Sequence, residues 1–107
     1  MPEIQIFLLR GPDQVIEFMN PVAFELAGVG SEVFGTPFRE AFRPFPESSS
    51  EMFDTVLKTG QPFYAHELRV PIPDGSGERF FNVRCQPLQD YRGTLLLTVA
   101  ATTLRYR

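Results

Sequence analysis

Residues 18–28 decide the fold, because the hydrophobic period changes inside this stretch: Phe18-Met19-Asn20-Pro21-Val22-Ala23-Phe24-Glu25-Leu26-Ala27-Gly28. Asn is a favoured helix N-cap, and Pro fits the first helical position, where an N–H would have no partner. Asn20-Pro21 therefore predicts the end of a strand and the start of a short helix over 22–27. Gly28 is suited to the left-handed residue that stops a helix.

The residues before this switch predict a β-hairpin. Side chains alternate in character over 3–9 and 14–19, and the turn-forming run Arg10-Gly11-Pro12-Asp13 separates the two segments. The residues after the switch predict short helical turns over 31–34 and 38–42.

A longer helix is expected over 48–60, because Ser48 and Glu51 have capping-box spacing and an apolar stripe follows. Three strands are then expected over 63–72, 79–88 and 94–102, with a hairpin turn at 73–77. Pro71 favours an edge position for the first of these strands, and Pro87 marks the end of the second. Two strands, helices and three strands in this order predict an α+β domain whose five-stranded antiparallel sheet is covered on one face.

Composition excludes several classes of function. The chain has 107 residues and a net charge of −3, which argues against nucleic acid as a main partner. A single Cys and a single His exclude an internal disulfide and a cysteine-built zinc site, and they leave no catalytic constellation. No apolar run approaches the roughly 20 residues of a membrane helix. We therefore expect one cytoplasmic, non-enzymatic domain over 1–107 with no membrane contact.

The order of these elements and their turn residues resemble the PAS domain, a signalling module of bacterial sensor kinases and regulators. The resemblance is carried by residues 18–28 and by four later pieces: Glu32-Val33-Phe34-Gly35-Thr36-Pro37, Lys58-Thr59-Gly60-Gln61-Pro62, the aromatic strand beginning Phe80-Phe81-Asn82-Val83, and Pro87-Leu88-Gln89-Asp90. It implies a five-stranded sheet with helices on one face and a pocket between them. Many members end the last strand in an Asp-x-Thr coupling element, whereas this chain has Ala101-Thr102-Thr103.

The resemblance leaves the cofactor unknown, but it disfavours two kinds. Haem-binding members place an axial His on the long helix, and residues 49–59 contain none. Flavin photoadducts use a Cys in the middle third, and residues 32–50 contain none. Asn82 falls near an amide position of flavin-binding members, although its strand parity is ambiguous. A small organic acid or an empty pocket remains compatible with the family.

The ligand-pocket candidates are Phe53 on the apolar stripe of the expected helix and the strand residues whose parity points inward: His66, Leu68, Phe81, Val83, Cys85 and Leu97. His66 shares the parity of Leu68 and Val70, so it is either a polar ligand contact or an edge-strand residue that reaches solvent. Cys85 is either a redox-sensing thiol or a small apolar core residue. The further polar candidates are Thr59 and, with the opposite parity, Tyr64.

Eight phenylalanines are expected either to line the pocket or to fill it: Phe18, Phe24, Phe34, Phe38, Phe42, Phe53, Phe63 and Phe81. Because interiors are close-packed, a filled or small cavity is favoured.

The opposite face of the sheet is the candidate interface, with Phe7, Phe80, Leu96 and Thr98 as its residues. Two functions follow from these features. The first is a sensory module of a larger bacterial signalling protein, for example a histidine kinase of a two-component system, that binds a small ligand or relays a signal through the sheet face. The alternative is a ligand-free interaction module with a Phe-filled core, forming a homodimer or docking a flanking output domain.

Overall fold

The computed structural model describes residues 4–42, 47–71 and 77–104. Five strands form one sheet in the order β2-β1-β5-β4-β3, and every neighbouring pair is antiparallel. The strands are β1 (Ile4–Arg10), β2 (Val15–Met19), β3 (Phe63–Pro71), β4 (Glu78–Gln89) and β5 (Leu95–Thr103). The predicted fold class is confirmed, and β3 occupies the edge position that Pro71 predicted.

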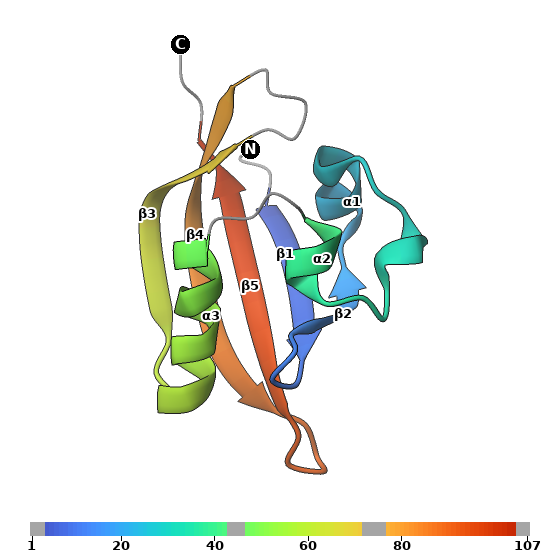
Figure 1. The fold of residues 1–107 in the computed structure, drawn as a ribbon, viewed down its shortest axis with the longest axis vertical. Helices are drawn as coiled ribbons and strands as arrows, with labels where there is room; N and C mark the ends of the chain where they lie inside the picture. Colours follow the sequence, from blue (N-terminus) through green and yellow to red (C-terminus); the bar gives the residue numbers. More distant parts are fainter. Residues whose placement is uncertain (1–3, 43–46, 72–76, 105–107) are drawn as a thin grey trace.

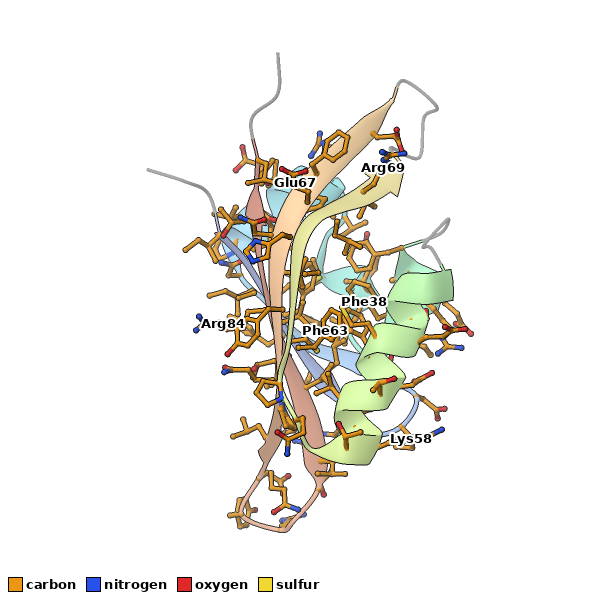
Figure 2. The ribbon with its side chains drawn as sticks, turned by 90° about the vertical axis from the view of Figure 1, so that its left-hand side faces the viewer. Phe38, Lys58, Phe63, Glu67, Arg69 and Arg84 are labelled. Carbon is orange, nitrogen blue, oxygen red and sulfur yellow. The ribbon has the colours of Figure 1, made fainter. Side chains whose placement is uncertain are left out.

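The helices lie between β2 and β3 in the sequence and on one side of the sheet in space (Figure 1). They are α1 (Pro21–Ala27), the 3₁₀ turn η1 (Ser31–Val33), α2 (Phe38–Ala41) and α3 (Glu47–Thr59). The helix-covered side is called the inner face and the other side the outer face. Figure 2 shows Phe38 and α3 on the inner side and Arg84 on the outer side, where the described chain places no helix.

Asn20 caps α1 and also fixes that helix to the sheet. Its Oδ1 accepts hydrogen bonds from the backbone N–H groups of Ala23 and Ile6, each at 3.0 Å, and its Nδ2 donates to the Ile4 carbonyl. Gly28 ends the helix at φ 69°, in the left-handed region. The predicted helix start at Asn20-Pro21 and the predicted helix stop at Gly28 are both confirmed.

The main core lies between the inner face and the helices. It is built from alternate residues of the central strands, such as Leu9, Cys85, Leu97 and Val99, and from the apolar stripe of α3. The Cα radius of gyration is 13.3 Å. This value is close to the roughly 13 Å expected for a domain of this length.

Two boundaries differ from the sequence prediction. Helix α3 already includes Glu47, so Ser48 lies inside the helix and is not its N-cap. Strand β4 continues through Pro87 to Gln89. Its neighbour β3 pairs with it only as far as Cys85, so Pro87 lies where β4 has an open edge on that side. Proline is tolerated at such an open edge, since no ladder hydrogen bond is lost there. Of the predicted 73–77 turn, only Gly77 lies within the described residues.

Gln14, predicted as a strand residue, instead occupies the hairpin turn and joins it to the helices. The backbone of Gln14 has φ 55°, and Gln14 is only 2% exposed. The side-chain Nε2 donates to Asp54 Oδ1 of α3 at 2.6 Å, and the carbonyl accepts from the Phe38 N–H of α2 at 2.9 Å. One turn residue thereby fixes two helices relative to the β1–β2 hairpin.

Candidate ligand cavity

A cavity of about 200 Å³ lies between the inner face and the helices. Strands β1, β3, β4 and β5 and the helices α1, α2 and α3 all contribute apolar side chains to its walls. Four predicted pocket residues line it, namely Phe53, Leu68, Phe81 and Val83. The expectation of a small cavity in a Phe-rich core therefore matches the geometry.

The aromatic wall of the cavity is a cluster of rings, most of which meet edge to face, while Phe38 and Phe42 are tilted at 37° to each other. The Phe38 ring lies 5.4 Å from Phe7 and 5.5 Å from Phe53, both near perpendicular, and 4.6 Å from Phe42. Such arrangements are the favoured geometry of aromatic pairs. The rings therefore pack against one another along one side of the cavity.

The other predicted lining phenylalanines lie elsewhere. Phe24 and Phe34 form a separate T-shaped pair at 5.5 Å, while Phe18 and Phe63 are 46% and 40% exposed. Phe7 takes their place in the cavity wall.

Two polar side chains in the described lining were not among the predicted pocket residues. Gln5 of β1 is 3% exposed, and its Nε2 donates to Thr103 Oγ1 at 3.1 Å. Arg79 of β4 pairs in register with Val70, lines the cavity and donates to the Leu26 carbonyl of α1 at 3.5 Å. The available signal was parity: Gln5 shares the parity of Phe7 and Leu9, and Arg79 shares the parity of Phe81 and Val83.

Cys85 and Leu97 face inward as predicted but lie in the packed core outside the cavity lining. Both are 0% exposed. Burial raises the pKa of the Cys85 thiol to about 12, so the thiolate is disfavoured at neutral pH. This environment supports the apolar-core interpretation of Cys85 over a redox-sensing role.

The prediction that His66 faces the pocket is wrong. The β3–β4 register shifts between Ala65 and Leu68, and Glu67 takes a left-handed conformation at φ 54°. This bulge reverses the parity, so His66 is exposed and lies beside a shallow hollow of the outer face with Tyr64. Thr59 at the end of α3 is also exposed, and neither Thr59 nor Tyr64 lines the cavity.

Asn82 stabilises the same bulge. It pairs in register with Thr102 on the outer face, and its Oδ1 accepts the Glu67 N–H at 3.2 Å. A contact between Asn82 and a flavin in the cavity is therefore ruled out by its direction.

The predicted interface set divides between the two faces. Phe7 is wrongly placed, because it pairs with the inward Val99 and packs against Phe38 and Phe42. Leu96 lies on the outer face but is only 4% exposed. Phe80 and Thr98 lie there half-buried, with the Arg69 guanidinium 5.7 Å from the Phe80 ring centre.

Besides Tyr64 of β3, which is 53% exposed, the well-exposed apolar side chains of the outer face come from β1, β2 and β4. Ile4 and Ile6 are 45% and 41% exposed, while Phe18 and Leu88 are 46% and 48% exposed. Both residue sets of β1 are largely apolar, so its alternation did not indicate which of them faces the helices.

The cavity does not fit a haem or a cysteinyl flavin adduct. Its described lining contains no His and no Cys. Its volume of about 200 Å³ is below the roughly 300–1,000 Å³ of sites for drug-sized ligands. Within the described residues, no group of three or more His, Cys, Asp or Glu side chains could hold a metal ion.

The comparisons with known proteins agree with this geometry. The family model for the PAS fold matches residues 2–107, so the chain belongs to the PAS family. The family match marks it as a non-catalytic module of the sensory and signalling kind. Comparison of the sequence with curated proteins found no match.

Three solved structures illustrate the likeness. Vibrio cholerae VqmA is 17% identical with a TM-score of 0.75; the match covers 96% of this chain but only 47% of the VqmA chain. The PAS domain of nitrogen regulation protein NR(II) from Vibrio parahaemolyticus is 14% identical with a TM-score of 0.71, over 94% and 89% of the two chains. The PAS domain of histidine kinase ThkA is 25% identical with a TM-score of 0.72, over 98% and 100%.

No helix among the described residues is both long enough and apolar enough to span a membrane.

Proposed function

We propose that this PAS domain is the cytoplasmic sensory module of a larger bacterial signal-transduction protein, such as a histidine kinase of a two-component system. In this proposal a small organic ligand occupies the cavity and its binding is passed to an output domain. The observation that carries the proposal is the apolar cavity of about 200 Å³ beneath the helices. Ligand sites are typically apolar concavities with a few fixed polar groups, and Gln5 and Arg79 are such groups here.

Native mass spectrometry of the freshly purified chain tests this proposal. We expect a mass above that of the sequence, and we expect the excess to disappear in an Ala101→Leu variant. Ala101 is 8% exposed and lines the cavity, so the longer side chain projects into the ligand space. Sequence mass for the wild type, together with no shift in its Tm on addition of toluene as a neutral ring probe, would contradict the proposal. A cooperative unfolding transition of Ala101→Leu confirms that this variant is folded.

The exposed outer face favours a second candidate function, association of two copies of this chain. Ile4, Ile6 and Phe18 are each more than 40% exposed on neighbouring strands, and contiguous apolar surface of this kind commonly marks a protein interface. The VqmA structure, of the same fold, is described as a dimer.

Sedimentation velocity tests this second candidate. We expect Ile6→Lys to convert a dimer into a monomer, and we expect Tyr91→Lys to leave the dimer intact. Tyr91 is 89% exposed but lies in the β4–β5 turn, away from the outer face. A monomeric wild type, or a dimer that Ile6→Lys does not affect, would contradict the assignment. Leu96 is unsuitable for this test, because a charge at a residue only 4% exposed would destabilise the fold itself.

A further inference from the structure

Arg79 has surroundings that differ from those of the other arginines in the described chain. Each of the others has a carboxylate within 4.0 Å or an aromatic ring beneath its guanidinium; they are Arg10, Arg39, Arg69, Arg84 and Arg92. Among the described residues, the acceptor that Arg79 reaches is the neutral carbonyl of Leu26, at 3.5 Å. This is longer than the roughly 2.7–3.2 Å of ordinary N–H···O hydrogen bonds.

The position of Arg79 brings this cation to the ligand space. Its register partner is Val70, and both side chains line the cavity beside Phe81. Arg79 is the single charged residue in the described lining, which contains no Asp and no Glu. A guanidinium at an apolar wall is half-buried and has several N–H donors to satisfy. An anion in the cavity would satisfy them and would meet no opposing carboxylate from the lining residues that the structure describes.

Carboxylate is the anion that best suits this donor. The planar guanidinium binds a carboxylate through two parallel hydrogen bonds, and such charge-assisted bonds are about twice as strong as neutral ones. A ligand carboxylate would therefore displace the long contact to Leu26 at little cost.

The size and the walls of the cavity restrict the remainder of the ligand. An apolar cavity of ~150 Å³ is known to hold benzene, and this cavity measures about 200 Å³. One ring with a short acid arm is thus the largest aromatic acid expected without rearrangement. Five phenylalanines supply edges and faces for that ring: Phe7, Phe38, Phe42, Phe53 and Phe81.

We propose that the cavity selects a one-ring aromatic monocarboxylate and that Arg79 is the residue that recognises its carboxylate. The inference rests on the proposed function, because it assigns a chemical class to the ligand of the same cavity. The ring lies among the phenylalanines, and the carboxylate lies at the β4 wall next to the end of α1.

Calorimetric titration at pH 7 with 3-phenylpropanoate and with the isosteric, neutral 3-phenylpropanamide tests the inference. We expect the wild type to bind the acid about tenfold or more tightly than the amide, the effect of one charge-assisted interaction. Arg79→Gln removes the charge and leaves a shorter, neutral polar side chain, so it should abolish this preference while retaining amide binding, which also confirms folding. Arg79→Lys should keep part of the preference, and Arg69→Gln on the outer face should keep all of it.

The contradicting outcomes separate two failures. Equal binding of acid and amide by the wild type, or an acid preference that survives in Arg79→Gln, overturns the role of Arg79 but leaves a ligand cavity in place. Binding of toluene without binding of the acid has the same meaning. Failure of the acid, the amide and toluene alike to bind overturns both this inference and the proposed function.

Discussion

Gln5 Nε2 donates a hydrogen bond to Thr103 Oγ1 at 3.1 Å, and this bond joins the wall of the cavity to the last residue of β5. Gln5 itself lines the cavity, while Thr103 lies within Ala101-Thr102-Thr103, where many PAS relatives carry an Asp-x-Thr coupling element. A polar path therefore leads from the proposed ligand site to the end of the central strand without the aspartate.

Thr103→Val removes the hydroxyl of this pair at nearly constant shape. We expect the free energy of unfolding in urea to fall by about 1 kcal/mol, because the Gln5 amide loses a buried partner. Thr102→Val is the matched control: Thr102 faces outward next to Ile4, and the change there should be near neutral. An equal loss in both variants would show that the hydroxyl at Thr103 has no special role.

The bulge in β3 predicts an unusual order of stability at Glu67. Its φ of 54° disfavours any residue with a Cβ, so Glu67→Gly should be more stable than Glu67→Ala by about 1 kcal/mol. At Tyr64, a regularly paired position of the same strand, the order should reverse, since glycine costs roughly 0.5–1 kcal/mol in a strand. Urea unfolding of the four variants measures both orders of stability. The same order at both positions would contradict the left-handed conformation assigned to Glu67 in the bulge.

Asp90 predicts a dependence of stability on acid pH. Hydrogen bonds from the Arg10 guanidinium, and then from the Thr94 and Arg92 N–H groups, hold the pKa of Asp90 below its ordinary value. A lowered folded-state pKa means that the stabilisation is present above the unfolded-state pKa, about 3.9 for Asp, and is lost as the pH falls through the lower folded-state value.

Asp90→Asn should therefore be less stable than the wild type at pH 7, and the difference should shrink as the pH falls below the ordinary range of Asp. Urea unfolding at a series of pH values measures this difference. In an Arg10→Met background the pH dependence of the Asp90→Asn effect should be much reduced. A stability difference between the wild type and Asp90→Asn that stays constant down to pH 2 would exclude Asp90 as a source of the pH dependence.

Cys85 should be chemically silent in the native state. The residue is 0% exposed and burial raises its pKa to about 12, so little thiolate is available near pH 8. Labelling with an aromatic disulfide reagent should be slow in buffer and immediate in concentrated urea. Fast labelling of the folded protein would revive the redox-sensing interpretation.

The sequence predicted the order of elements because local signals agreed with the tertiary structure. Asn20-Pro21, Gly28 and the apolar stripe of α3 each act within a few residues, and each occurs where expected. The error at His66 arose because parity had to be carried across an irregularity in β3. A single bulge at Glu67 moved His66 to the outer face.

The cavity was harder to predict, because it depends on how side chains from distant strands meet. Phe7 was assigned to the wrong face because Ile4, Ile6 and Leu8 form an equally apolar alternative. Arg79 was not among the predicted pocket residues, and its register opposite Val70 places it at the cavity. Periodicity alone does not indicate whether packed rings leave space between them.

Methyl NMR with toluene as a neutral probe is the most direct test of the central claim, that this cavity accepts a small ligand. The account predicts saturable shifts of the Val83 and Val99 methyl groups, which line the cavity, and unchanged Ile6 methyl groups on the outer face. The same titration of Ala101→Leu should give much weaker shifts. Unmoved cavity methyl groups at saturating toluene, or the largest shifts at Ile6, would contradict it.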